Sequence, residues 1–235
     1  LMQVADLKAI VEFSREHRLY SIIDNTFTSP INFRPLEHGF DLSIHSCSKY
    51  LNGHSDIVAG AVIGPEELIS TITHKLNHLG GTLDPHACFL LHRGIKTLAL
   101  RVRQQNASAL EIARFLESRP EVERVHYPGL ASHPQHKRAR ELFDGFGGML
   151  SFELQGGVEP AERFIHNATI PICAPSLGGV ESLITRPVKT SHACLSPEEC
   201  KQVGISEGLI RLSVGLEATA DILSDFDQAL RTSKL

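Results

Sequence analysis

Apolar residues along the first part of the chain predict short strands that alternate with helices. Apolar and β-branched runs, each ended by a polar group, predict strands at residues 19–23, 42–46 and 57–63. Apolar positions at helical spacing predict helices at residues 4–17, 65–79 and 85–93. This alternation predicts an α/β arrangement with a largely parallel sheet.

The second part of the chain begins with a longer helical pattern. Apolar positions at helical spacing predict a helix over 96–118, which Arg119-Pro120 ends. Shorter patterns then predict strands at 122–127, 147–154 and 208–214, and helices at 135–143, 159–167 and 217–231. We therefore expect two units, residues 1–95 and residues 96–235, the second being a smaller α+β domain entered through the long helix.

Composition narrows the classes of protein to consider. Hydrophobic residues make up 42% and charged residues 21%, which is enough apolar material for a folded core. A net charge of −4 gives no broad electrostatic case for binding nucleic acid or an anionic membrane. No apolar run approaches the roughly 20 residues needed to span a bilayer, and residues 1–8 lack the pattern of a signal peptide.

Cysteine and histidine spacing gives no indication of a disulfide framework or a metal site. The five cysteines include no Cys-x-x-Cys pair, which favours a reducing, cytoplasmic location. The 13 histidines are scattered and form no His-Glu-x-x-His motif, so we expect no metal and place a metal-dependent hydrolase last among the alternatives.

Two charged residues follow predicted strands. Lys49 comes after the second strand in a turn rich in serine and glycine; a partly desolvated lysine there is nucleophilic, while an exposed loop lysine is the simpler alternative. Hydroxyls of Ser46 and Ser48 are suited to holding a phosphate. Asp24 ends the first strand, where it either pairs with a cofactor's ring nitrogen or caps the next turn. Ligands of open α/β sheets bind at this edge.

Two further sites lie in the second unit. Arg211 interrupts an apolar strand and shares a face with Leu209 and Ser213, where it either grips a carboxylate or forms a salt bridge with Glu217 or Asp221. The Gly-Gly pair in residues 175–183 indicates either a backbone passing close to another group or a plain turn.

Taken in order, these motifs resemble the Cys/Met-metabolism family of pyridoxal-phosphate (PLP) enzymes, which includes cystathionine γ-synthase, cystathionine γ-lyase, cystathionine β-lyase and methionine γ-lyase. The resemblance spans essentially the whole chain and rests on residues 24–27, 46–50, 53–56, 93–98, 127–130, 176–183 and 209–217. It implies an α/β fold of the PLP-dependent transferase type I (aspartate aminotransferase-like) class, with residues 1–95 as the C-terminal part of the PLP-binding large domain and 96–235 as the connecting helix and small domain.

The resemblance also implies roles at the cofactor. Lys49 would be the lysine that carries PLP as a Schiff base, and Asp24 would pair with the pyridine nitrogen. Ser46 and Ser48 would hold the phosphate; the family usually has threonine at the second of these positions, so Ser48 keeps the hydroxyl.

For the substrate, the resemblance implies that Arg211 binds the α-carboxylate and that Ser176 lies in a loop near the lysine. It predicts a transsulfuration enzyme that acts on sulfur amino acids or activated homoserine esters by γ-elimination or γ-replacement. Pro175 stands where many γ-enzymes carry glutamate, so synthase, γ-lyase, methionine γ-lyase and β-lyase chemistry stay open.

The chain resembles only the C-terminal three-fifths of the family, and no match exists for its N-terminal phosphate loop or stacking tyrosine. We therefore expect weak PLP binding by this chain alone, and a non-catalytic scaffold is the alternative from another class. The retained Asp24, Ser46, Ser48, Lys49 and Arg211 oppose that alternative, because a scaffold needs none of them together. The resemblance further implies a homo-oligomer, a dimer of dimers.

Overall fold

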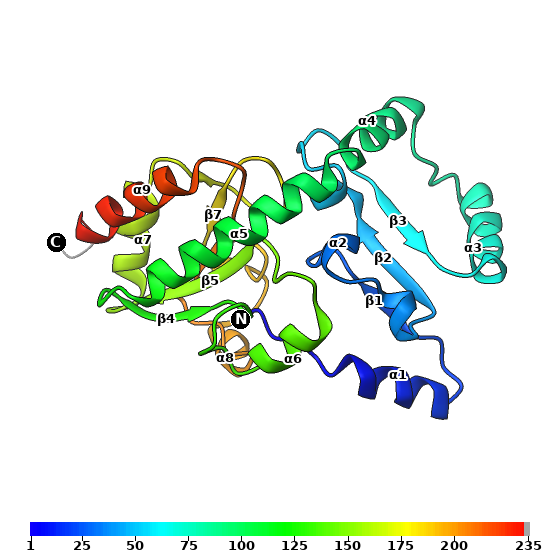
Figure 1. The fold of residues 1–235 in the computed structure, drawn as a ribbon, viewed down its shortest axis with the longest axis horizontal. Coiled ribbons are helices and arrows are strands. Elements are labelled where there is room, and N and C mark those ends of the chain that lie inside the picture. Colours follow the sequence, from blue (N-terminus) through cyan, green and yellow to red (C-terminus); the bar gives the residue numbers. More distant parts are fainter. Residues whose placement is uncertain (233–235) are drawn as a thin grey trace.

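The computed structural model describes residues 1–232, in which the chain forms two β-sheets (Figure 1). The first sheet contains β1 (Ile22–Asp24), β2 (Leu42–Ser46) and β3 (Gly60–Ile63) in that order. β1 and β2 are parallel, but β3 is antiparallel to β2, so the expected largely parallel sheet is wrong. The reason is the connection: residues 47–59 form the helical turn η2 (Cys47–Leu51) and a loop, not a helix that crosses the sheet.

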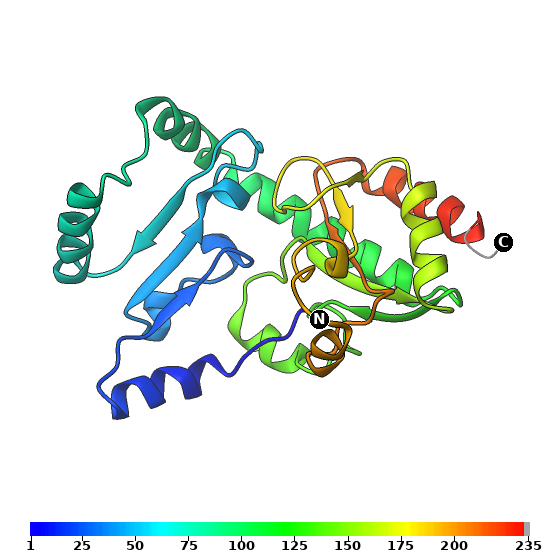
Figure 2. The same ribbon diagram turned by 180° about the vertical axis from the view of Figure 1, so that it is seen from behind.

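The second sheet has the strand order β4-β5-β8-β7-β6 and is mostly antiparallel. Its strands are β4 (Val122–His126), β5 (Met149–Leu154), β6 (Ile172–Cys173), β7 (Leu183–Thr185) and β8 (Ile210–Ser213). The main core lies between this sheet and three helices, α5 (Leu98–Glu117), α7 (Val158–Asn167) and α9 (Thr219–Thr232). Figures 1 and 2 show α5 running from the first sheet across the second.

Strand alternation decides which residues of the second sheet reach the core. On β5, Leu150 and Phe152 enter the core, where Phe152 packs edge-on against Phe164 of α7 at 5.4 Å between ring centroids. Met149 and Ser151 point to the opposite face because successive side chains alternate. Arg211 is the register partner of Ser151, so it shares this opposite face. The strand pattern therefore leaves one face of the sheet available for a site.

The remaining helices lie outside the main core. They are α1 (Leu7–Glu16), α2 (Ser29–Asn32), α3 (Glu66–Leu79), α4 (Pro85–Ile95), α6 (His136–Leu142) and α8 (Pro197–Gln202), with shorter turns η1 (Pro35–His38) and η3 (Pro187–Lys189). Every helix and strand expected from the sequence is present within a few residues, but α2, α8, β6 and β7 were not predicted. None of the helices in residues 1–232 is long and apolar enough to cross a membrane.

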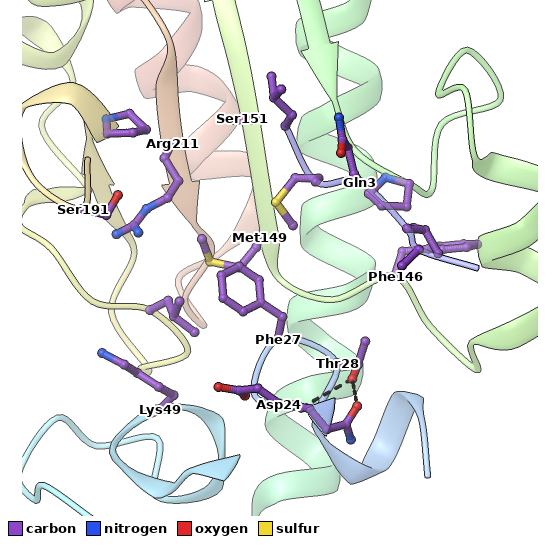
Figure 3. Close-up of a pocket in the computed structure, with 18 of the residues that line it drawn as sticks. Gln3, Asp24, Phe27, Thr28, Lys49, Phe146, Met149, Ser151, Ser191 and Arg211 are labelled. Carbon is purple, nitrogen blue, oxygen red and sulfur yellow. Dashed lines mark hydrogen bonds between the residues drawn. The ribbon is translucent and has the colours of Figure 1, made fainter. Parts of the chain in front are cut away.

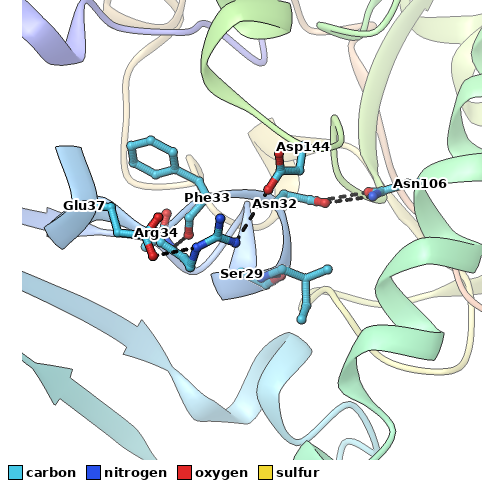
Figure 4. Close-up of polar contacts among 9 residues, drawn as sticks. Ser29, Asn32, Phe33, Arg34, Glu37, Asn106 and Asp144 are labelled. Carbon is cyan, nitrogen blue, oxygen red and sulfur yellow. Dashed lines mark hydrogen bonds and ion pairs between the residues drawn. The ribbon is translucent and has the colours of Figure 1, made fainter.

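Polar contacts connect α2, which follows β1 in the chain, to α5 and to the loop after α6 (Figure 4). The amides of Asn32 and Asn106 form two reciprocal hydrogen bonds, of 3.0 and 2.8 Å. Asn106 Oδ1 also accepts from the Gly147 amide at 2.9 Å, and Arg34 Nη1 lies 3.5 Å from an Asp144 oxygen. These contacts fix the segment of α2 against the long helix and the loop after α6.

The close packing of Gly94 in α4 against the backbone of Asn52 leads to a prediction about stability. A Cβ placed on Gly94 of α4 would lie 2.4 Å from the Asn52 carbonyl oxygen, which is backbone and cannot move aside cheaply. Gly94→Ala is expected to lower the free energy of unfolding by about 1–3 kcal/mol, measured by urea denaturation. Gly60→Ala is the control, because its Cβ would meet nothing nearer than 3.7 Å. Equal stability of the two variants would contradict this packing.

Candidate active site

A cavity of about 1090 Å³ opens between the carboxyl end of the first sheet and the free face of the second (Figure 3). Its wall includes four of the six residues that the sequence singles out: Asp24, Lys49, Ser176 and Arg211. Asp24 ends β1 and Lys49 follows β2, and these parallel strands end at the same edge. Arg211 enters from β8, on the other side of the cavity (Figure 3).

Among the described residues, Ser176 is the polar partner of the Lys49 side chain. Its Nζ donates to Ser176 Oγ at 2.7 Å. The backbone of Lys49 (φ −99°, ψ −130°) departs from helical geometry inside η2. Desolvation lowers the pKa of the Lys49 amine, and the nearby Arg211 cation lowers this pKa further. The neutral, nucleophilic form of the amine is therefore more accessible than in an exposed lysine.

Ser176 lies between the lysine and the arginine. Its hydroxyl accepts from Lys49, and its carbonyl accepts from Arg211 Nη2 at 2.8 Å. Its φ of +98° is in a region that residues other than glycine rarely adopt. Backbone strain of this kind persists where surrounding contacts enforce it, and it is concentrated at functional sites.

Arg211 does not form the salt bridge that the sequence left open. Among the described residues it has no carboxylate partner, and Glu217 instead accepts hydrogen bonds from the Ser182 amide and hydroxyl at 2.7 and 2.8 Å. Burial lowers the pKa of the Arg211 guanidinium, which stays a cation because its ordinary pKa is far above neutrality. Its remaining N–H groups suit a carboxylate bound in the cavity.

Asp24 is more exposed than its place after an apolar strand suggested. Its Oδ1 accepts from the Thr26 amide at 2.9 Å, so the carboxylate caps the next turn. The same carboxylate lines the cavity (Figure 3). The two alternatives considered for Asp24 are therefore compatible, since one oxygen suffices for the cap.

Ser46 and Ser48 are not part of the cavity wall. Ser48 Oγ accepts from the Ala59 amide at 2.9 Å, and the Ser46 amide donates to Thr26 Oγ1 at 2.8 Å. Both serines adjoin Lys49 in the chain, but their role as phosphate ligands stays a prediction.

The structure adds a segment that the sequence gave no reason to select. Residues 187–192 line the cavity with Lys189, Ser191 and His192. A polar stretch after a proline indicates only a loop, so no pattern marks it as part of a site. In the described chain, no group of three histidine, cysteine or acidic side chains is arranged to hold a metal ion.

Comparison with known proteins identifies the family of this chain. A sequence model of the family described as "Cys/Met metabolism PLP-dependent enzyme" matches residues 1–231. The chain belongs to this family. Its members use PLP, and two groups of the cavity wall fit that cofactor: an amine of lowered pKa suits its aldehyde, and a carboxylate suits its ring nitrogen.

Relatives within the family have several different activities. The chain is 46% identical to L-methionine γ-lyase of Pseudomonas putida, over 99% of the chain and 59% of the relative. It is 43% identical to cystathionine β-lyase of Coxiella burnetii, over 97% of the chain and 60% of the relative. The structure of cystathionine γ-lyase from Lactobacillus plantarum, complexed with L-serine, matches with a TM-score of 0.95 at 40% identity, over 99% of the chain and 61% of that protein.

These matches show the fold of the PLP-dependent cystathionine enzymes, as the resemblance implied. The chain spans about three-fifths of the length of these relatives.

Proposed function

We propose that this chain is the lysine-bearing part of a PLP-dependent transsulfuration enzyme, which acts on sulfur amino acids or activated homoserine esters by γ-elimination or γ-replacement. The observation that carries the proposal is the convergence of Lys49 and Arg211 on Ser176, one on its hydroxyl and the other on its carbonyl. An amine and a guanidinium on either side of one cavity suit a cofactor aldehyde and an amino-acid carboxylate.

Each side chain then has a defined task. Lys49 would hold the cofactor through its amine and, when that amine is free, would move the proton at the substrate Cα. Arg211 fixes the substrate carboxylate, which orients the Cα–H bond for that transfer. PLP supplies the electron sink that stabilises the resulting negative charge. Asp24 favours the protonated form of the ring nitrogen, and Ser46 and Ser48 bind the phosphate.

The preference for γ-chemistry rests on the loop at 176–183, whose sequence Ser-Leu-Gly-Gly-Val-Glu-Ser-Leu resembles that of the γ-synthases and γ-lyases more than that of the β-lyases. Overall identity does not choose among the activities, because the γ-lyase, γ-synthase and β-lyase relatives are 42–46% identical to the chain. Pro175, which lines the cavity, departs from the glutamate of many γ-enzymes and keeps β-elimination as the alternative.

Product analysis tests the proposal. The chain, extended by the N-terminal segment of its relatives, is incubated with PLP and with cystathionine, methionine or an O-acylhomoserine plus cysteine. The γ-reactions release a four-carbon 2-oxo acid or form cystathionine, whereas β-elimination of cystathionine releases a three-carbon 2-oxo acid. A protein that binds PLP but forms none of these products would favour the scaffold alternative.

Asp24→Asn tests the proposed pairing with the ring nitrogen. The amide oxygen of asparagine keeps the cap on the Thr26 amide, but the variant lacks the negative charge that favours a protonated ring. We expect PLP affinity to fall about 10–100-fold, the value of one charged hydrogen bond, in an absorbance titration. Asp221→Asn, at an exposed site on α9, is the control. Unchanged PLP affinity of Asp24→Asn would contradict the pairing.

The assembly and location are proposals of the same kind. The family resemblance supports a homo-oligomer, a dimer of dimers, that takes a small amino-acid substrate. A cytoplasmic location is supported by the five cysteines, which are all free thiols in this structure.

A further inference from the structure

Two polar side chains of α5 are buried where an amphipathic helix would carry apolar residues. Arg101 is 4% exposed and Gln105 is 0% exposed. They are four residues apart, so they lie on the same face of the helix, about one turn from each other. Neither contacts the cavity, yet each is bonded to a segment that carries a cavity residue.

Arg101 holds the turn that follows Lys49. Its guanidinium donates to the Tyr50 carbonyl at 2.8 Å and to the Leu51 carbonyl at 3.2 Å. Further hydrogen bonds reach the Gly94 carbonyl and the Thr97 hydroxyl. All of these partners are neutral, so this buried cation serves to fix carbonyl groups, not to neutralise a charge. Gly53 fits beside the guanidinium because it has no Cβ. A Cβ at this position would lie 2.0 Å from Arg101 Nη1.

Gln105 holds the loop that carries Ser176. Its Nε2 donates to the Gly179 carbonyl at 2.8 Å. Its Oε1 is buried and accepts no hydrogen bond from the described residues. A buried, unpaired oxygen costs stability, so packing alone does not explain a glutamine at this position.

The two segments touch each other directly beneath the site. A Cβ on Gly178 would lie 2.8 Å from the Tyr50 amide nitrogen, so the loop backbone packs against the Lys49 turn. The Gly178 amide also donates to Ser213 Oγ of β8 at 2.9 Å. The loop is thus fixed from the β8 side and from α5, and the Lys49 turn is fixed from α5.

We propose that Arg101 and Gln105 are positioning residues, which use one face of α5 to set the Lys49 turn against the Ser176 loop and thereby keep Lys49 Nζ on Ser176 Oγ. Neither side chain touches the substrate or the cofactor. The proposal rests on the proposed function, in which Lys49 and Ser176 belong to the active site.

Two variants test the proposal: one removes the hydrogen bond from Gln105 to the Ser176 loop, and the other disrupts the hydrogen bonds from Arg101 to the Lys49 turn. Gln105→Met keeps the length of the side chain, deletes the hydrogen bond to Gly179 and removes the unpaired oxygen, so we expect it to retain the wild-type thermal midpoint. Arg101→Lys keeps the charge but cannot span several carbonyls with a planar fork. Gln104→Met and Arg103→Lys are matched controls, because both residues are exposed on the same helix and Gln104 also donates one hydrogen bond, to Ser108.

The readout is the titration of the Lys49 amine in the chain without cofactor. Trace acetic anhydride acetylates neutral amines between about pH 6 and about pH 11, and peptide mass spectrometry reports Lys49 against exposed Lys75. The other charged or titratable residues that line the cavity with Lys49 are the same in every variant: Asp24, Lys189, His192 and Arg211.

In the wild type, we expect the Lys49 midpoint below the ordinary lysine value, since burial lowers this pKa. Gln105→Met and Arg101→Lys should shift the midpoint to higher pH, because a loosened turn or loop admits water to the amine, and the controls should leave it unchanged. A folded Gln105→Met variant with the wild-type midpoint would overturn the proposal, even if Arg101→Lys failed to fold.

This experiment separates the two proposals. If Lys49 shifts as expected but PLP never modifies it in the chain extended by the N-terminal segment of its relatives, the positioning holds and the proposed function fails. If PLP modifies Lys49 and neither variant shifts its midpoint, the function holds and the positioning fails.

Discussion

Lys49→Ala is expected to abolish covalent attachment of PLP and to lower turnover by at least about 10²–10⁴-fold, the usual contribution of a positioned acid–base group. Alanine removes both the amine that reacts with the cofactor aldehyde and the group that moves the Cα proton. Burial and the nearby Arg211 cation lower the pKa of this amine, which makes its neutral form more accessible than in an exposed lysine. Absorbance of the PLP-treated protein measures attachment, and product release measures turnover.

A second lysine that lines the same cavity provides the control for Lys49→Ala. Lys189 also lines the cavity, but its Nζ donates to Glu162 at 2.6 Å and its side chain is 65% exposed. The ion pair with Glu162 engages the Lys189 amine, which makes it a poor candidate for attack on the cofactor aldehyde. Lys189→Ala should therefore retain PLP attachment. Attachment that survives in Lys49→Ala but disappears in Lys189→Ala would transfer the cofactor role to Lys189.

Arg211→Ala is expected to raise KM for the amino-acid substrate about 10–100-fold, with a smaller effect on PLP binding. Each charged hydrogen bond lost to the carboxylate is worth about 1.5–3 kcal/mol. Arg211 has no carboxylate partner in the described chain, so its charge is available to the substrate. Initial rates over a range of substrate concentrations give KM and kcat separately.

Arg211→Lys distinguishes binding of the carboxylate from support of the loop. Lysine retains the charge but not the bidentate geometry, so it should recover part of the affinity. The alanine variant also loses the hydrogen bond to the Ser176 carbonyl, and a fall in kcat with the KM of the wild type would assign Arg211 to loop support alone. That result would contradict its role as the carboxylate ligand.

The sequence is sufficient to predict which site residues follow β1 and β2, because short runs of apolar residues determine where these strands end. Asp24 and Lys49 follow apolar runs that are themselves sufficient to predict β1 and β2, and parallel pairing brings their ends together. Arg211 was identified because a charge interrupted an apolar strand. These inferences needed only alternation and the position of one charged residue.

Contacts between distant segments were beyond that reasoning. The hydrogen bond from Lys49 to Ser176 joins residues 127 positions apart, and the strained φ of Ser176 follows from that packing. No sequence pattern singles out Arg101 of the long helix, yet it is buried and donates to carbonyl groups of the η2 turn. The strands β6 and β7 have two and three residues, too few for alternation to be recognised.

The central claim is that Lys49 is the attachment site of PLP, and mapping the attachment tests it most directly. The chain, extended by the N-terminal segment of its relatives, is treated with PLP, its visible spectrum is recorded, and borohydride then fixes the cofactor before peptide mass spectrometry. The account predicts a visible band that reduction removes, with the label on Lys49 in excess of the exposed lysines. Label distributed over the exposed lysines with none on Lys49 would contradict it.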